Sequence, residues 1–285
     1  MISEKQFEKE LDIIITNAVR EDVGRGDYSS LACIPESAQG KAKLLVKEDG
    51  IIAGVEFAKR IFKYVDINLQ VETLINDGTE VKHGDIVFYV SGKSLSILKS
   101  ERLVLNAMQR MSAIASKTKQ FAHLLEGTKT KILDTRKTTP GIRAIEKWAV
   151  KIGGGENHRF ALYDMIMLKD NHIDFAGGIT KAITKTQNYL EENLLDLKII
   201  VEARSLDEIK EILKSDGIHR ILIDNFNYAD TCKAVALIGD KCETESSGNI
   251  KLDTAKKYAD CGVDYISSGA LTHSVYNMDL SLKAL

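Results

Sequence analysis

The sequence lacks a long apolar run and an excess of charge of one sign. No apolar stretch approaches the roughly 20 residues that a membrane-spanning helix needs, which predicts a protein that is not inserted in a membrane. Lysine and arginine number 39, aspartate and glutamate number 41, and the formal net charge is -2. This balance produces no overall field that favours nucleic acid or an anionic membrane surface. Any anion site must therefore be built locally.

Proline and cysteine are also scarce. The only prolines are Pro35 and Pro140, and no linker rich in serine or glycine interrupts the chain, so domain boundaries must be inferred from pattern. The four cysteines form no CxxC pair and are too few for a disulfide framework, which predicts a reducing, cytoplasmic location. They are Cys33, Cys232, Cys242 and Cys261.

The length of 285 residues and the hydrophobic content of 44% allow about two domains. The first residues, MISEKQFEKELDIIITNAV, predict a surface helix and not a signal peptide. Residues 42–90 contain short β-type runs separated by Asp-Gly, His-Gly and Ser-Gly pairs, which predicts a small strand-rich domain. Ser100 resembles the cap of a long helix that begins with ERLVLNAM.

The second half of the chain alternates strand-like and helix-like segments. Acidic or serine residues close four successive strand segments at intervals of 21 or 22 residues, at Glu202, Asp224, Glu245 and Ser267. This interval accommodates a strand, a helix and two short loops, as in a parallel β/α barrel. A doubly wound sheet shows the same alternation, so the pattern favours the barrel but leaves both folds open.

Cationic residues follow the first strand segment and lie in the loop after the next helix, and a β/α barrel binds ligands at its strand ends. TKILDT runs into Arg136 and Lys137, although a solvated basic turn would have the same sequence. His158 and Arg159 offer donors for a carboxylate, although a histidine there can also be structural. They follow three glycines, which are expected where backbone approaches a ligand or adopts a positive φ, although one glycine, Gly153, could simply end a helix.

Lys169 directly follows the apolar segment MIML and is therefore expected at the mouth of the barrel. Two roles are open to its ammonium group: a point charge that binds an anion, or a Schiff-base nucleophile. The other cations predicted at the same rim favour anion binding.

Carboxylates and small residues close the remaining strand segments. Glu202 and Asp224 suit a Mg²⁺ ion held partly by substrate phosphates, although either could instead cap a helix. The turns at 246–249 and 267–270 contain small residues whose N–H groups can cradle a phosphate. Together these features predict transfer from a metal-bound phosphorylated donor to an anionic acceptor.

Several motifs, in order, resemble those of the quinolinate phosphoribosyltransferase family: EDVGRGDYSSLACIP, ERLVLNAMQRMSAIAS, ILDTRKTTPGIRAIEKWAVKIGGGENHR, MLKDNHI, LIDN, ESSG and SSGALTHS. The resemblance covers about residues 21–280. It implies an α/β sandwich domain, residues 1–112 joined by the tail 275–285, and an incomplete, seven-stranded TIM-like β/α barrel, residues 113–274. It also implies a homodimer, or a hexamer, in which the neighbouring subunit completes each site.

The resemblance further implies that quinolinate and phosphoribosyl pyrophosphate, with Mg²⁺ as cofactor, give nicotinate mononucleotide, pyrophosphate and CO₂ in de novo NAD biosynthesis. The implied catalytic residues are Lys137, Lys169, Glu202 and Asp224, of which Glu202 and Asp224 would hold the metal. Arg102 would reach into the neighbouring subunit's site. The implied substrate-binding residues are Arg102, Thr135, Arg136, Lys137, His158, Arg159, Lys169, Ser247, Gly248, Ser268, Gly269 and His273.

Two positions depart from the family's motifs. Asn249 stands where glycine is expected in ESSGG, and Ser268 stands where a small apolar residue is more usual in SVGAL. Asparagine tolerates left-handed backbone better than most residues, so Asn249 is expected to preserve the loop. At Ser268 the departure weakens the predicted phosphate contact more than the departure at Asn249 does.

Three other functions remain open on the sequence. One is a phosphoribosyltransferase for another aromatic acid, against which the joint presence of Arg102, Arg136 and Arg159 argues. A second is a biotinyl or lipoyl carrier, since GTEVKHGDIVFYVSG resembles its hairpin but lacks a lysine at a tight tip. The third is an aldolase that uses Lys169.

Overall fold

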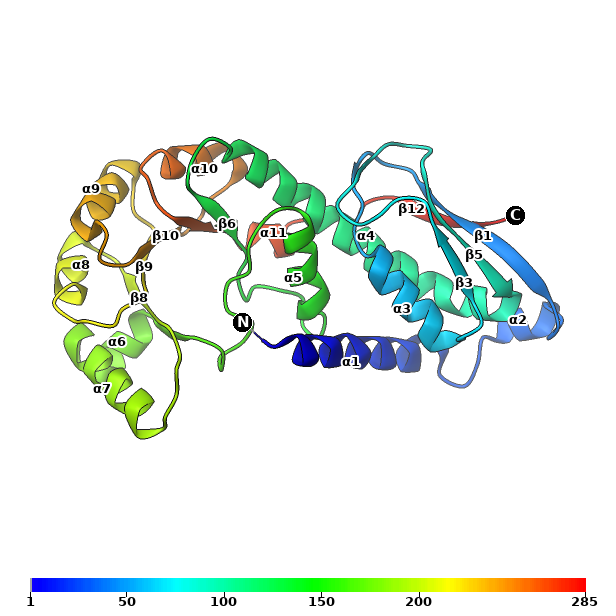
Figure 1. The fold of residues 1–285 in the computed structure, drawn as a ribbon, viewed down its shortest axis with the longest axis horizontal. Coiled ribbons are helices and arrows are strands. Elements are labelled where there is room, and N and C mark those ends of the chain that lie inside the picture. The colour runs from blue at the N-terminus through cyan, green and yellow to red at the C-terminus, as the bar shows by residue number, and fades with distance from the viewer. Residues whose placement is uncertain (1) are drawn as a thin grey trace. The chain divides into compact units, whose positions relative to one another are not determined.

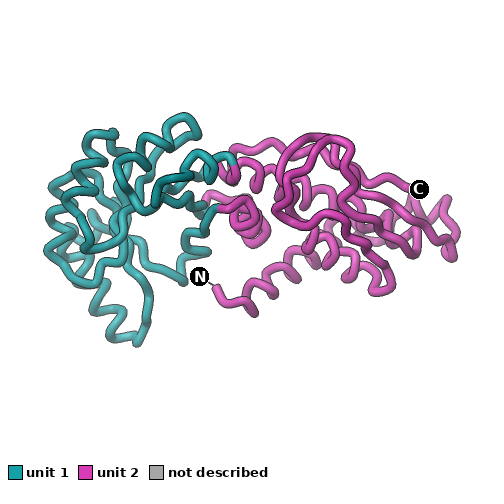
Figure 2. Tube along the Cα trace, turned by 45° about the horizontal axis from the view of Figure 1, so that its top comes forward, with its two compact units in different colours: residues 1, 120–136, 155–270 teal, residues 2–119, 137–154, 271–285 magenta. Residues whose placement is uncertain are grey.

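The computed structural model describes residues 2–285, which form eleven helices and twelve strands (Figure 1). They divide into two compact units, shown in two colours in Figure 2. We call residues 120–136 and 155–270 the barrel unit, and residues 2–119, 137–154 and 271–285 the sandwich unit. The domain boundaries expected at residues 112/113 and 274/275 stay a prediction.

The sandwich unit contains an antiparallel sheet in the order β12-β1-β5-β3. Its strands are β1 (Gln39–Val46), β3 (Gln70–Thr73), β5 (Ile86–Lys93) and β12 (Leu280–Ala284). The C-terminal strand β12 pairs with β1, where Leu282 lies opposite Leu44. A second, two-stranded sheet joins β2 (Gly50–Ile51) to β4 (Glu80–Val81).

Helices pack on this sheet and on one another through aromatic contacts. Phe62 of α3 meets Phe88 of β5 edge to face, with ring centroids 5.8 Å apart. Phe7 of α1 meets Trp148 of α5 in the same way at 5.6 Å. The predicted N-terminal surface helix is confirmed as α1. The helices of this part of the chain are α1 (Glu4–Val23), α2 (Tyr28–Cys33), α3 (Val55–Val65), α4 (Ser94–Leu124) and α5 (Arg143–Ile152).

The predicted long helix is present as α4, but its expected start at Ser100 is wrong. The helix begins at Ser94, and Ser100 lies inside it, fully buried. The Ser100 hydroxyl donates a hydrogen bond to the carbonyl oxygen of Ser96 at 2.6 Å, four residues earlier. Serine can make such a bond within a helix as readily as it caps one, and the sequence does not distinguish the two.

The barrel unit contains a curved parallel sheet with helices along its outer side (Figure 1). The sheet order is β6-β11-β10-β9-β8-β7. Its strands are β6 (Lys131–Leu133), β7 (Ile166–Leu168), β8 (Ile199–Ala203), β9 (Arg220–Asp224), β10 (Glu243–Ser247) and β11 (Tyr265–Ser267). The helices are α6 (Asp170–Ala176), α7 (Ile179–Glu192), α8 (Leu206–Ile212), α9 (Tyr228–Ile238) and α10 (Leu252–Ala259); the short α11 (Ala270–His273) begins at the last residue of this unit and continues into the sandwich unit.

This strand order distinguishes a barrel from a doubly wound sheet. Strands β7 to β11 are neighbours in chain order, and β11 pairs with β6, the first strand of the unit, so the chain runs once around. A seventh parallel position follows α5, where Glu156 forms a bridge with Leu133 and donates from its N–H to the Ile132 oxygen at 2.8 Å. The predicted incomplete β/α barrel is confirmed.

The glycine triplet serves packing at its first position. A β-carbon on Gly153 would lie 2.4 Å from the Ala115 carbonyl oxygen and 2.7 Å from Cβ of Thr118, so the end of α5 can approach α4 only without a side chain. Gly154 has a φ of +88°, a left-handed conformation that favours glycine. Gly153 ends α5 as the alternative expected, and its close neighbour is α4 rather than a ligand, whereas the positive φ expected of such glycines is found at Gly154.

One disulfide joins two neighbouring helices of the barrel unit. It links Cys232 of α9 to Cys261, which follows α10, with Cα atoms 4.6 Å apart, whereas Cys33 and Cys242 are free. The interpretation of the cysteines as reduced thiols is therefore wrong for this pair. The two cysteines are 29 residues apart, and only the barrel places them together.

Replacing Cys232 and Cys261 by serine is expected to lower the free energy of unfolding by about 3 kcal/mol, because the bond closes a loop of 29 residues. Urea unfolding followed by circular dichroism, with and without dithiothreitol, measures the change. The reductant should destabilise the wild-type protein and leave the double variant unchanged. A wild-type midpoint that does not respond to reductant would contradict the bond.

Candidate active site

The C-terminal ends of the barrel strands carry most of the residues predicted from the sequence. Thr135 and Arg136 follow β6, Lys169 follows β7, and Asp224 ends β9. The others at these ends are His158, Arg159, Glu202, Ser247, Gly248, Ser268 and Gly269. Arg102, Lys137 and His273 belong to the sandwich unit.

The guanidinium groups of Arg136 and Arg159 interact electrostatically at these strand ends. Arg159 is only 6% exposed, and its Nη1 donates to the Met165 carbonyl oxygen at 3.1 Å. Burial, followed by the charge of Arg136, lowers the pKa of Arg159, while Asp164 acts in the opposite direction. Two cations in this relation repel each other until an anion lies between them, and arginine's planar fork matches carboxylate oxygens. The pair therefore suits a multiply charged acid.

Two carboxylates form a corresponding acidic pair. Glu202 is 9% exposed, and burial, followed by the charge of Asp224, raises its pKa. Lys169 opposes the shift, with its Nζ 4.0 Å from Oε2 of Glu202. Within residues 2–285, no group of three or more His, Cys, Asp or Glu side chains could enclose a metal. A cation here would need substrate oxygens as well, which fits Mg²⁺.

Lys169 is placed as a point charge. Its side chain is 49% exposed, and its main-chain N–H donates to Nδ1 of His172 at 3.0 Å in the first turn of α6. A Schiff-base lysine is usually desolvated, whereas this ammonium is half exposed beside a carboxylate. The geometry therefore favours anion binding over an aldolase role.

Asn225 connects the acidic pair to the predicted phosphate loop. Its side-chain amide donates to Oδ2 of Asp224 at 2.7 Å, and its main-chain N–H donates to the Ser247 oxygen at 2.9 Å. A β-carbon on Gly248, whose φ is +96°, would lie 2.2 Å from Oδ1 of Asn225. Asn249 has a φ of +51°, so the expected left-handed asparagine is confirmed. Asn225 was missed as a site residue, although it stands in LIDN.

Ser268 uses its donors inside the protein. Its hydroxyl donates to the Ile250 oxygen at 3.0 Å, and its N–H donates to the Leu133 oxygen at 3.1 Å. Both bonds hold β11 and its turn to neighbouring segments. The phosphate contact predicted for Ser268 stays a prediction, and these bonds favour a structural role.

Asp134 was also missed and organises the second cationic loop. It is fully buried, and its carboxylate accepts from Nδ2 of Asn157 at 2.6 Å and from the N–H of His158 at 2.8 Å. These bonds fasten the loop that carries Arg159 to the end of β6. A carboxylate in the buried run ILDT was the available signal, because such a charge requires partners.

A buried ion pair fastens two loops of the sandwich unit. Glu146 is fully buried and accepts from Nε of Arg110 at 2.9 Å and from the N–H and hydroxyl of Thr139 at 3.0 and 2.8 Å. Arg110 also donates to the carbonyl oxygen of Thr272, whose hydroxyl donates to the Lys137 oxygen at 2.8 Å. The loops bearing Lys137 and His273 are thus held together.

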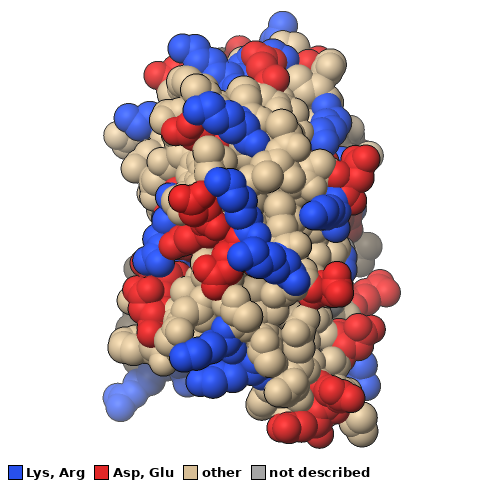
Figure 3. All heavy atoms as spheres, turned by 90° about the vertical axis from the view of Figure 1, so that its left-hand side faces the viewer, with Lys and Arg blue, Asp and Glu red and all other residues tan. Residues whose placement is uncertain are grey.

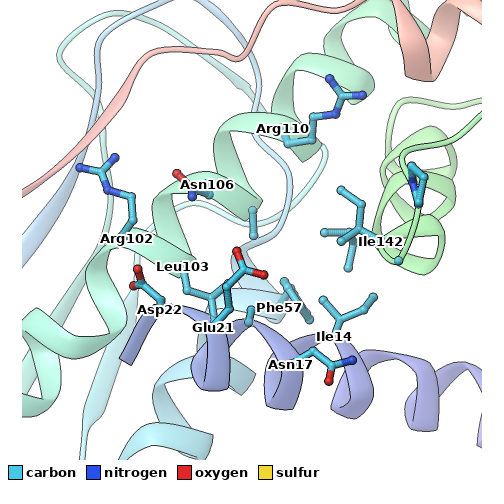
Figure 4. A pocket seen from close by; sticks show the side chains of 15 residues that line it. Ile14, Asn17, Glu21, Asp22, Phe57, Arg102, Leu103, Asn106, Arg110 and Ile142 are labelled. Atoms are coloured by element: carbon cyan, nitrogen blue, oxygen red, sulfur yellow. The ribbon is translucent and has the colours of Figure 1, made fainter. Parts of the chain in front are cut away.

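A pocket of about 360 Å³ in the sandwich unit includes Arg102. Figure 4 shows Arg102 and Arg110 on α4 and Glu21 and Asp22 on α1 among the side chains that line it. The remaining lining residues are Ile14, Asn17, Ala18, Phe57, Leu103, Asn106, Ala107, Pro140, Gly141, Ile142 and Ile145.

The face in Figure 3 carries basic and acidic side chains side by side, in keeping with the charge balance of the sequence. In residues 2–285, no helix combines the length and apolarity needed to cross a bilayer.

An incomplete β/α barrel with paired cations, paired carboxylates and small-residue turns at its strand ends is the arrangement expected of a barrel phosphoribosyltransferase. Profiles of the N-terminal and C-terminal domains of quinolinate phosphoribosyl transferase match residues 27–112 and 114–283, respectively. The chain therefore belongs to the quinolinate phosphoribosyltransferase family, as its motifs predicted.

Named relatives and solved structures agree with this assignment. The chloroplastic nicotinate-nucleotide pyrophosphorylase [carboxylating] of Oryza sativa subsp. japonica is 46% identical over 96% of this chain and 77% of its own length. The probable enzyme of that name from Bacillus subtilis is 37% identical over 96% and 93%. The crystal structure of NadC from Streptococcus pyogenes has a TM-score of 0.89 at 37% identity and covers 100% and 99% of the two chains.

Proposed function

We propose that the chain is a decarboxylating quinolinate phosphoribosyltransferase, which makes nicotinate mononucleotide, pyrophosphate and CO₂ from quinolinate and phosphoribosyl pyrophosphate in NAD biosynthesis. The observation that carries the proposal is the presence of two like-charged pairs on one set of strand ends: Arg136 with Arg159, and Glu202 with Asp224. The cationic pair suits a dicarboxylate. The acidic pair suits a metal-bound diphosphate.

The first step forms a bond between the quinolinate nitrogen and C1 of the ribose while the bond to pyrophosphate breaks. Arg136 and Arg159 orient the acceptor through its carboxylates, and Lys137 contacts the phosphoribosyl donor. We propose Mg²⁺ as the cofactor, held by Glu202, Asp224 and substrate oxygens, where it would neutralise the departing pyrophosphate. Ser247 and Gly248 would receive the ribose phosphate at the turn after β10.

The second step is loss of CO₂ from C2 of the ring. The new N-ribosyl bond makes the ring nitrogen positive, so it stabilises the electron pair left on C2 when the carboxylate departs. That carbon then takes a proton. No further cofactor is needed, and nicotinate, which lacks this second carboxylate, should be a poor acceptor.

The test is an assay of the purified protein with quinolinate, phosphoribosyl pyrophosphate and Mg²⁺, in which nicotinate mononucleotide and CO₂ are measured. Nicotinate is the control acceptor. Product from quinolinate alone supports the proposal, and turnover of nicotinate but not quinolinate would show that the arginines are wrongly assigned.

We further propose a homodimer, or a hexamer built from it, in which Arg102 reaches into the neighbouring subunit's site. Two features support this: Arg102 is exposed, and it borders a pocket together with Glu21 and Asp22. An arginine at a solvent-facing pocket remains available for a ligand of the neighbouring subunit.

We also propose a cytoplasmic location, which imaging of a fluorescent fusion would test.

Mixed subunits test the shared site. Arg102→Ala and Lys137→Ala homodimers are each expected to be nearly inactive. After mixing and subunit exchange, half of the dimers should be heterodimers with one intact site, which recovers about a quarter of wild-type activity if dimers form at random. Activity that stays at the level of the separate variants, although exchange is shown by mass spectrometry, would contradict the shared site.

A further inference from the structure

Glu245 is a fully buried carboxylate that the reaction described above does not use. It lies in the middle of β10, opposite Leu222 of β9 and Tyr265 of β11, two residues before the strand ends at Ser247. The sequence pattern had placed it at the strand end, which is wrong. Because a buried charge is strongly unfavourable without partners, its neighbours define its role.

Arg220 is the first partner of Glu245. Its Nη1 donates to Oε2 of Glu245 at 2.8 Å, while its Nε and Nη2 donate to Oε2 of Glu243 at 2.9 and 2.7 Å. The guanidinium also stacks on the ring of Tyr265, 3.9 Å from the centroid. Arg220 is thus fixed by Glu243 and Tyr265, and it presents one N–H group to Glu245.

His158 is the second partner. Its Nε2 lies 3.3 Å from Oε2 of Glu245, and its Nδ1 accepts from the N–H of Arg159 at 2.7 Å. Because Nδ1 accepts this bond, Nε2 is the ring nitrogen that faces Glu245. Burial opposes ionisation, but His158 and Arg220 lower the pKa of Glu245 to about 2, so the carboxylate stays charged.

These contacts form a chain from the barrel interior to the predicted anion site. Arg220 holds Glu245, Glu245 faces His158, and His158 accepts from the main chain of Arg159. The ring is 7% exposed, and a rotation would remove its contacts on both sides. The orientation of the His158 ring therefore determines the position of the Arg159 main chain, and with it the position of the Arg159 side chain at the strand ends.

We infer that Glu245, held by Arg220, is a positioning residue for the acceptor: it fixes the His158 ring and, through it, Arg159 at the carboxylate-binding site. The inference rests on the proposed function, because it takes the anion at Arg159 to be quinolinate. His158 then acts by holding Arg159 rather than by direct contact through a free ring nitrogen.

A purely structural carboxylate would behave differently from a positioning one. Loss of a structural ion pair would lower stability and affect both substrates alike. Loss of the positioning contact should weaken quinolinate binding, leave the KM for phosphoribosyl pyrophosphate near the wild-type value, and depend on the presence of His158.

The test is Glu245→Gln, with Glu243→Gln as the matched control. Glu243 lies on the same strand and has a side chain that is 33% exposed; it contacts Arg220, His219 and Tyr265 rather than His158. Loss of a group that orients a ligand-binding residue commonly changes affinity by about tenfold or more, so Glu245→Gln should raise the quinolinate Kd and KM by about tenfold. Glu243→Gln keeps an amide oxygen that can accept from Arg220, and Tyr265 and Glu245 still hold the guanidinium, so this variant should leave both constants within about twofold.

Calorimetric titration with quinolinate and initial rates with each substrate give these constants, and thermal unfolding verifies that each variant is folded. If Glu245→Gln does not fold, Arg220→Lys, which retains the charge but loses the fork, should raise the quinolinate Kd in the same direction. In a His158→Gln background, Glu245→Gln should have no further effect on quinolinate binding. That dependence would show that Glu245 acts through His158.

Three results would overturn the inference: an unchanged quinolinate Kd in folded Glu245→Gln, equal losses for both substrates, or a full effect that persists without His158. Wild-type protein that binds quinolinate without turning it over would refute the proposed function alone, because the Kd comparison between variants would still decide the role of Glu245. Wild-type protein that does not bind quinolinate would refute both.

Discussion

Glu202→Gln is expected to lower kcat/KM by about a thousandfold, because neutralisation of a leaving group by a bound metal contributes several kcal/mol to the transition state. The change removes one of two neighbouring carboxylates: burial first, and then the charge of Asp224, raise the pKa of Glu202. Asp224→Asn should act in the same direction. Initial rates at increasing MgCl₂ concentration measure the effect, and the variants should need far more Mg²⁺ for the activity that remains.

The same variant has a second expected result, on stability. The folded-state pKa of Glu202 lies above its ordinary value. In the pH range between these two pKa values, the folded protein binds more protons than the unfolded chain. Without metal, the wild-type protein therefore loses stability as the pH rises through this window. Glu202→Gln does not titrate, so at neutral pH without Mg²⁺ its Tm should exceed that of the wild type.

The control is Asp207→Asn, on α8 just after the same strand. Asp207 has a side chain that is 87% exposed and pairs only with Lys210, so its loss should change neither Mg²⁺ dependence nor Tm. Mg²⁺ should raise the Tm of the wild type and of Asp207→Asn but not of Glu202→Gln. If Mg²⁺ stabilises Glu202→Gln as strongly as the wild type, the metal does not bind at this carboxylate pair.

The strand ends of the barrel could be predicted from the sequence because they obey a period. Once Glu202 and Asp224 were placed about one β/α unit apart, the parallel sheet required their side chains to reach the same rim. The closure of the sheet into a barrel could not be predicted in this way. It depends on pairing between β11 and β6, for example Ile266 with Ile132, and such distant pairing leaves no local pattern.

The residues behind the site were missed for a different reason. Asp134 and Glu245 are charges within apolar strands, and the sequence marks them as unusual without naming their partners. The partners, Asn157 for Asp134 and Arg220 for Glu245, lie 23 and 25 residues away along the chain. At Gly153 the sequence predicted that the backbone closely approaches another group. It did not identify that group as α4.

Glu146→Leu is expected to lower the free energy of unfolding by about 3 to 5 kcal/mol, because it leaves Arg110 without its buried counter-charge. Glu146 is fully buried, and the Arg110 side chain is 20% exposed. Urea unfolding measures the loss. The same change removes both hydrogen bonds that hold Thr139, so the loop that begins at Lys137 loses its anchor as well.

The double variant Arg110→Leu/Glu146→Leu separates the two effects. Replacing both members of a buried ion pair by apolar side chains is often neutral, so most of the lost stability should return. Activity should not return, because the bonds from Thr139 to Glu146 and from Arg110 to the Thr272 oxygen are still missing, which leaves only the Thr272 hydroxyl to join the loops of Lys137 and His273. A displacement of about 1 Å at a catalytic group can lower the rate about a hundredfold, which is the expected loss in kcat/KM. If the double variant regains both stability and activity, the ion pair serves folding alone, and Lys137 is positioned by other contacts.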